Sequence, residues 1–290
     1  MSNRVQTGGP SGAATGPVIE ALASRETSLG GGLGIRRALP HRLRRRVGAW
    51  CFLDHFGPLD LDPGSPGMRV GPHPHMGLQT VSWLYAGAVL HRDSLGCRQL
   101  IHPGELNLMT SGHGISHSEE SPQPHPHALH GLQFWIALPD AARHMAPAFE
   151  HHAVLPVIAR SGMRLTLVIG EGVGERSPAR VHSPLAGFDV QLSDTGRRPL
   201  PLNPAFEYAL LVTAGELSAA DTRMQPGTLY YLGSGRDTLA LDNAAPARAF
   251  LFGGAPLREE VLLWWNFVAR STAEMQAARA EWQAGGARFG

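Results

Sequence analysis

The stretch "HPGELNLMTSG" (His102–Gly112) has a partial copy 123 residues later, "QPGTLYYLGSG" (Gln225–Gly235). Each copy contains a Pro-Gly pair, a leucine two residues further on and a closing Ser-Gly, and an Ala-Gly pair precedes each one. Agreement at several positions with a single offset is typical of an internal repeat. The sequence therefore predicts one β unit used twice, the first ending near Pro139 and the second starting near His151.

The segments between turn residues indicate strands. The chain has 35 glycines and 23 prolines among its 290 residues, and they bound short segments such as "QTVSWLY" and "LQFWIAL". Short segments rich in β-branched and aromatic residues predict an all-β barrel or sandwich. Only residues 258–283, with apolar spacings of three and four and no proline, predict a helix. Trp264 and Trp265 are expected to dock that helix against a barrel.

Bulk composition limits the partners and the location. The formal net charge is +1, which gives no general attraction for nucleic acid or acidic membranes, so neither is expected as a partner. No lysine occurs, which excludes Schiff-base chemistry and a phosphate-binding P-loop. The two cysteines are too few for a disulfide framework, and the N-terminus lacks the apolar core of a signal peptide. We expect a soluble cytoplasmic protein with a disordered tail over residues 1–17.

Histidine is concentrated in the first half of the chain, where 12 of the 15 lie between His73 and His152. In "GPHPHMG" (Gly71–Gly77), His73 and His75 have strand parity, so both side chains can point to one face. The proline between them lacks an N–H and predicts a strand entrance or edge. In "GHGISHSEES" the same parity pairs His117 with Glu119.

Two such pairs on neighbouring strands would supply three imidazoles and one carboxylate around a single point. That donor set, with open coordination positions, suits Fe, Ni, Mn, Co or Cu. His125 and His127 share the spacing, but their proline-rich segment predicts a surface loop outside the site. His91 lies near a turn and is expected to be structural or exposed.

Four segments in order resemble the pirin family of the cupin superfamily, and the similarity runs from about Ile35 to Pro139. They are "RRALPHRLRRRVGAWCFLDHFGP", "GPHPHMGLQTVSWLYAG", "HPGELNLMTSGHGISHSEES" and "LHGLQFWIALP". The resemblance implies a bicupin, two tandem jelly-roll cupin β-barrels, here followed by a C-terminal helix. We expect a metal-binding barrel over residues 18–140, a second barrel over 151–255 and a helical segment over 256–290.

The resemblance also implies one divalent metal in the first barrel, held by His73, His75, His117 and Glu119. Iron is the expected metal, with Ni, Mn, Co, Cu and Zn as alternatives. Several family members have quercetin 2,3-dioxygenase activity, which implies a small flat phenolic substrate and O₂. Glu119 would then also be the catalytic base that removes the hydroxyl proton. No histidine follows His182, so the second barrel is predicted to be metal-free.

Two other functions stay open. Some family members act through protein partners, so the chain could be a non-enzymatic, redox-responsive regulator with a protein partner. One fold hosts many reactions, so a cupin enzyme of other specificity is the third candidate. The family pattern commonly has glutamate at the position of Gln79 and arginine at that of His113. Both residues are therefore expected near the metal, where Gln79 would orient a ligand through its amide.

Overall fold

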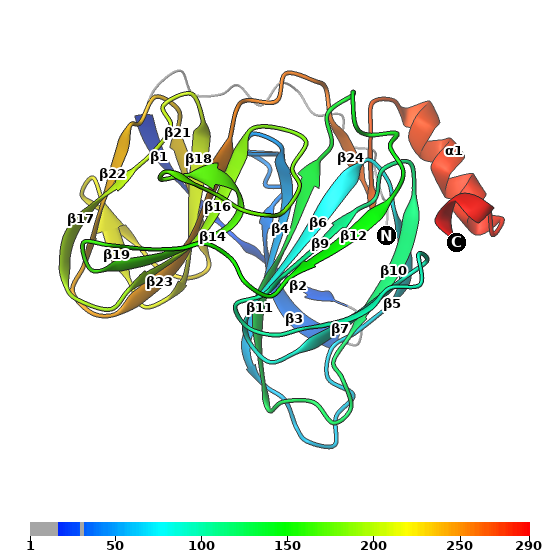
Figure 1. Ribbon diagram of the computed structural model, residues 1–290, viewed down its shortest axis with the longest axis horizontal. Coiled ribbons are helices and arrows are strands. Elements are labelled where there is room, and N and C mark those ends of the chain that lie inside the picture. The colour runs from blue at the N-terminus through cyan, green and yellow to red at the C-terminus, as the bar shows by residue number, and fades with distance from the viewer. Residues whose placement is uncertain (1–16, 30–31) are drawn as a thin grey trace.

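The computed structural model describes residues 17–29 and 32–290, and it consists of two β-barrels side by side with one helix on the outer side of the first (Figure 1). The predicted all-β bicupin fold with a C-terminal helix is confirmed. Residues 1–16 of the predicted disordered tail lie outside the described residues, and residue 17 begins a strand.

The first barrel consists of a seven-stranded and a four-stranded sheet. The larger sheet has the order β12 (Ala148–His152), β9 (Leu106–Thr110), β6 (Leu78–Ala86), β11 (Ala128–Ala137), β4 (Trp50–Asp60), β3 (Leu33–Leu39) and β2 (Arg25–Leu29). The smaller sheet has the order β5 (Arg69–His75), β10 (Ile115–Glu120), β7 (Val89–Asp93) and β8 (Arg98–Ile101). All the pairings are antiparallel, so each strand alternates between an inward and an outward face.

The second barrel repeats this arrangement. Its larger sheet has the order β1 (Pro17–Ala23), β21 (Thr228–Gly233), β18 (Glu207–Ala214), β23 (Ala247–Gly254), β16 (Leu185–Leu192), β14 (Met163–Gly172) and β13 (Val157–Arg160), with β15 (Glu175–Arg176) paired to β14. Its smaller sheet has the order β17 (Gly196–Pro201), β22 (Thr238–Asn243), β19 (Leu217–Ala219) and β20 (Thr222–Met224). Strand β22 begins and ends 123 residues after β10, which is the offset of the sequence repeat.

The two barrels exchange edge strands, which is where the topology departs from the expected domain boundaries. Strand β1, from the segment assigned to the first barrel, pairs with β21 of the second. Strand β12, which begins between the two expected barrels and ends within the second, pairs with β9 of the first. Each strand covers a sheet edge whose backbone N–H and C=O groups would otherwise lack partners. Short apolar segments such as "PVIEALA" show that a strand forms, but not which edge it will join.

A continuous apolar core joins the two large sheets. Trp50 and Phe134 of the first barrel contact Phe250 and Phe252 of the second, with ring centroids 4.8–5.4 Å apart. All four side chains are fully buried. The carboxylate of Glu207, also buried, accepts hydrogen bonds from the backbone N–H of Gly48 and the hydroxyl of Tyr231. The second barrel therefore covers one face of the first.

The C-terminal segment packs against the first barrel and corrects one prediction. Helix α1 spans Thr272–Gln283 rather than residues 258–283, and a hairpin of β24 (Leu262–Trp264) and β25 (Phe267–Ala269) precedes it. The hairpin sequence "LLWWNFVA" is rich in strand formers. Ser271 then caps the helix by accepting a hydrogen bond from the backbone N–H of Glu274. A short 3₁₀ turn, η2 (Ala287–Phe289), ends the chain.

The two adjacent tryptophans of this hairpin separate. Trp264 packs beside α1, where the Arg279 guanidinium lies 5.5 Å from its ring centroid. Trp265 is instead 44% exposed. No helix among the described residues is long and apolar enough to cross a membrane.

Candidate metal centre

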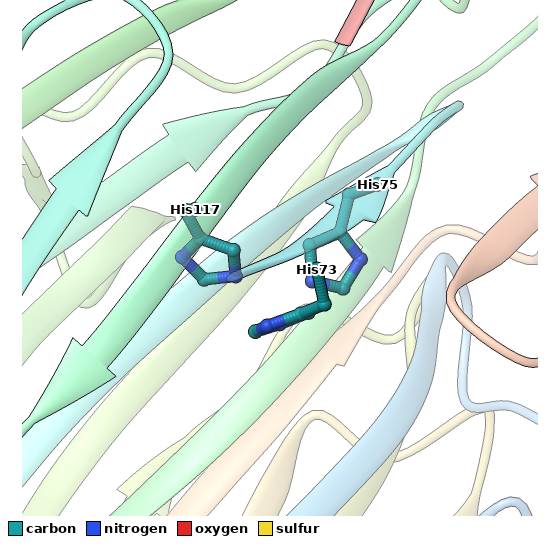
Figure 2. A group of neighbouring side chains, drawn as sticks. All are labelled: His73, His75 and His117. Carbon is teal, nitrogen blue, oxygen red and sulfur yellow. The ribbon is translucent and has the colours of Figure 1, made fainter. Parts of the chain in front are cut away.

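Three histidines from two paired strands converge inside the first barrel. His73 and His75 lie on β5, an edge strand as its prolines require, and His117 lies directly opposite His73 on β10. One ring nitrogen from each lies within 4.8 Å of the other two. Figure 2 shows the three imidazole rings turned toward a shared space. Strand parity thus brings these three residues together as the spacing predicts.

The hydrogen bonds of these histidines leave one nitrogen of each for a metal. Nδ1 of His73 lies 2.8 Å from the carbonyl oxygen of Gly71, and Nδ1 of His75 lies 3.0 Å from that of Asn266. A carbonyl only accepts, so each Nδ1 carries the proton and each Nε2 keeps its lone pair. Nε2 of His117 is buried without a hydrogen-bond partner. An unpartnered buried nitrogen is costly, and a metal ion would satisfy it.

Burial keeps the three rings neutral. Desolvation lowers the pKa of His75 and of His117 well below the usual value of 6.5, and the positive charge of a neighbouring imidazolium would lower it further. Desolvation also lowers the pKa of His73, although the hydrogen bond to Gly71 and the Glu119 carboxylate oppose this. Neutral imidazole is the form that coordinates metals. The site therefore needs no deprotonation at neutral pH.

Glu119 lies at the side of this cluster. Its carboxylate forms a group with His117 and His91 rather than with all three converging histidines. The β5–β10 register is irregular between His117 and Glu119, whereas the β10–β7 register is regular and sets Glu119 opposite His91. The hydroxyl of Ser82 lies 3.1 Å from Glu119 Oε1 and 2.8 Å from the side-chain oxygen of Gln133. Ser82 therefore helps to hold the carboxylate inside the barrel.

The structure adds a buried pair that sequence reasoning missed. Nδ1 of His91 lies 3.3 Å from Nδ1 of His117, and Nε2 of His91 lies 3.0 Å from Asp93 Oδ2. Burial opposes ionisation of Asp93, but hydrogen bonds from His91 and from the backbone of Cys97 and Leu95 lower its pKa below the usual value. The signal was the same i, i+2 spacing in "VLHRD" that was used for the other pairs.

The two residues that replace family side chains lie elsewhere. The amide nitrogen of Gln79 donates to the hydroxyl of Thr110 and to the carbonyl of Arg180, at the side that faces the second barrel. The backbone N–H of His113 donates to Met145, and its side chain is half-buried. Neither residue lines the cavity at the three histidines. The expectation that both lie near the metal is therefore not met by the geometry.

The second barrel has different side chains at the equivalent positions. The repeat offset and the β17–β22 register match His117 with Ala240, His73 with Pro199 and His75 with Pro201. Prolines and alanine have no side-chain donor atom for a metal. The metal-free second barrel stays a prediction, and these side chains are consistent with it.

A cavity of about 570 Å³ opens onto the three histidines. Aromatic rings form much of its wall: Phe52 and Trp135 stack with centroids 3.9 Å apart, and Trp265 lies at its side. Arg37, which lines the cavity, donates two hydrogen bonds of 2.8 and 2.7 Å to the buried carboxylate of Asp54. The cavity thus joins a nitrogen- and oxygen-rich floor to an apolar wall, which is typical of a small-molecule site.

Comparisons with known proteins agree with this architecture. A family model described as Pirin matches residues 32–136, and one described as Pirin C-terminal cupin domain matches residues 187–290. A Pseudomonas aeruginosa protein named "putative quercetin 2,3-dioxygenase" is 47% identical over 273 residues, 94% of this chain and 86% of that protein. A pirin-like protein of Caulobacter vibrioides is 35% identical, over 88% of this chain and 90% of its own length.

A solved structure has the same two-barrel fold. The crystal structure of a quercetin 2,3-dioxygenase from Acinetobacter baumannii superimposes with a TM-score of 0.91 at 42% sequence identity. The match covers 94% of this chain and 90% of that one, so it includes both barrels.

Proposed function

This chain belongs to the pirin family of the cupin superfamily, and from that premise we propose that it is a metal-dependent dioxygenase of the quercetin 2,3-dioxygenase type. The observation that carries the proposal is the convergence of His73, His75 and His117 beneath an aromatic-walled cavity. The proposed metal ligands are these three residues and Glu119. The two cysteines are both free, which fits the cytoplasmic location that we propose.

The donor set fits a divalent transition metal. Three neutral imidazoles suit Fe, Ni, Cu, Co or Zn, and a nearby carboxylate adds a harder ligand that Fe and Mn also accept. The unpartnered Nε2 of His117 is the observation that favours occupancy. Iron is the metal we propose. When bound, such a metal would supply a redox centre and a Lewis acid that stabilises the anion of the substrate.

The residues of the chain would bind and orient a flat phenol. The stacked pair of Phe52 and Trp135 offers planar apolar contact, and the ring of Trp135 meets that of His75 at 72°, with centroids 4.9 Å apart. The cavity volume lies within the range of sites that hold drug-sized ligands. These features support a flavonol-like substrate with its hydroxyl end at the histidines.

Glu119 would hold the substrate proton. Its carboxylate lines the cavity and is almost fully buried, so water competes little for it. The Ser82 hydroxyl orients Oε1, which leaves the other oxygen to accept a proton from a substrate hydroxyl. Removing that proton creates the electron-rich anion that is needed for reaction with O₂, and the apolar wall would limit the access of water that could reprotonate it.

Oxygen consumption on a panel of flavonols, catechols and enediols tests the proposal. We expect uptake with a flavonol, and a loss of at least about 100-fold in kcat for Glu119→Gln, because glutamine cannot take up the proton. Glu120→Gln is the matched control, since that carboxylate points away and pairs with Arg69 and Arg92. Metal uptake without oxygen consumption on any compound would favour the regulatory function instead. Turnover of enediols alone would favour a cupin enzyme of other specificity.

A further inference from the structure

The three converging histidines differ in what holds their second nitrogen. Nδ1 of His73 and Nδ1 of His75 are each held by a backbone carbonyl, which has a fixed charge distribution. Nδ1 of His117 is held by a side chain, the imidazole of His91. His117 is thus the one of the three whose support can be altered without moving the backbone.

When His91 is neutral, the donors and acceptors along this chain of hydrogen bonds allow one arrangement. Oδ1 of Asp93 accepts the backbone N–H groups of Leu95 and Cys97 at 2.9 and 3.0 Å, and Oδ2 accepts Nε2–H of His91 at 3.0 Å. A neutral His91 protonated at Nε2 has a lone pair on Nδ1. That lone pair accepts Nδ1–H of His117, so Nε2 of His117 must be the unprotonated nitrogen.

The position of His91 is fixed by packing as well. Its ring stacks on Phe149 with centroids 4.4 Å apart and an interplanar angle of 18°. The side chain of His91 is 3% exposed and that of Asp93 is fully buried, so the low local dielectric strengthens both hydrogen bonds. The Asp93 carboxylate polarises His91 and so makes Nδ1 of His91 a stronger hydrogen-bond acceptor for His117, without bringing a second anion to the cluster.

We propose that Asp93 and His91 form a positioning dyad that fixes the tautomer of His117 and makes its Nε2 a stronger metal donor. This inference rests on the proposed metal site at His73, His75 and His117. A carboxylate–histidine pair behind a ligand raises its basicity, and its loss typically weakens metal binding by about 10- to 100-fold. Neither Asp93 nor His91 is itself a ligand in this scheme.

Asp93→Asn provides a sharp test because the new amide has only one way to fit. The two backbone N–H groups require its oxygen at the Oδ1 position, so the NH₂ group must face Nε2 of His91. His91 then accepts at Nε2 and carries its proton on Nδ1, which faces Nδ1 of His117. His117 must move its proton to Nε2, the nitrogen that the metal needs. Asp60→Asn, on an exposed residue at the end of β4, is the matched control.

Two measurements read out the dyad. Long-range ¹H–¹⁵N NMR spectra of the metal-free protein report the tautomer of His117, and we expect Nδ1–H in the wild type and Nε2–H in Asp93→Asn. Chelator competition with Fe²⁺ or Ni²⁺ reports affinity, and we expect about 10- to 100-fold weaker binding for Asp93→Asn and no change for Asp60→Asn.

The possible failures are distinguishable. A wild type that binds metal, together with an Asp93→Asn variant that keeps both its affinity and its His117 tautomer, would overturn the dyad alone. An affinity loss in Asp93→Asn with the tautomer unchanged would also overturn it, because the effect would then be general destabilisation. A wild-type chain that takes up no metal would overturn the proposed metal site and, with it, the role of the dyad.

Discussion

The C-terminal hairpin should control the metal site through one glycine. Gly77 follows His75 by two residues, has a φ of +73°, and its missing Cβ would lie 2.2 Å from the carbonyl oxygen of Val268 on β25. Strand β25 is anchored here because the backbone N–H of Val268 donates to the carbonyl of Met76. The neighbouring carbonyl of Asn266 holds Nδ1 of His75 at 3.0 Å. The substitution Gly77→Ala therefore acts on a proposed ligand from a distance.

The expected size of the effect follows from the geometry. A real Cβ stays at least 3.0 Å from such an atom, so β25 must retreat by nearly 1 Å. The contact between His75 and Asn266 would then lengthen to nearly 4 Å, which is too long for a hydrogen bond. Alanine at this φ adds about 1–2 kcal/mol of backbone strain. Loss of the support behind His75 predicts about 10- to 100-fold weaker metal binding.

Chelator competition and thermal unfolding of the metal-free protein measure these two effects separately. Gly71→Ala is the matched control, because no atom lies within 4 Å of its built Cβ, its φ is not in the left-handed region, and its carbonyl still accepts from His73. Wild-type affinity in Gly77→Ala, with the expected drop in stability, would refute a role for the hairpin in positioning His75.

Three further outcomes are expected. Removing an imidazole with His75→Ala should abolish tight metal binding, whereas His127→Ala on the exposed loop should leave it intact; equal losses by metal analysis would contradict the parity argument. Burial lowers the pKa of His55 from 6.5 to about 3, so the unfolded chain binds more protons between these values and stability falls as pH decreases through this window. The free energy of unfolding should change by at most about 1.4 kcal/mol per pH unit in this window. Denaturant titrations of the metal-free protein should show a weaker pH dependence in His55→Gln, and an unchanged one would exclude His55 as its source. Replacing Arg37 by methionine leaves Asp54 buried without its partner and should lower the free energy of unfolding at pH 7 by about 2–3 kcal/mol. An unchanged free energy of unfolding in a denaturant titration would contradict this expectation.

The sequence predicts the parts of this molecule that depend on local periodicity. Strand parity is a property of neighbouring residues, so the convergence of His73 and His75 could be read directly. The Pro-Gly pairs at 103–104 and 226–227 predicted the duplicated β unit in the same way, because proline and glycine favour turns through their own local backbone conformations.

Features set by distant contacts could not be predicted. The edge that β1 joins depends on which sheet lacks a strand there, and the sequence of β1 carries no information about that. The hairpin over residues 262–269 combines the apolar spacing of a helix with residues that favour strands, so its local sequence leaves both open. In the folded chain it packs against Met76 as a hairpin. The irregular β5–β10 register between His117 and Glu119 depends on how the two strands pair, so neither strand's own sequence predicts it.

An anomalous-scattering map collected at the absorption edge of the metal found in the purified protein tests the central claim most directly. It should show one strong peak per chain, about 2.0–2.2 Å from Nε2 of His73, His75 and His117. A strongest peak on the loop at His125 and His127, or between β17 and β22 of the second barrel, would contradict the account. So would protein loaded with Fe²⁺ or Ni²⁺ that shows no peak between the three imidazoles.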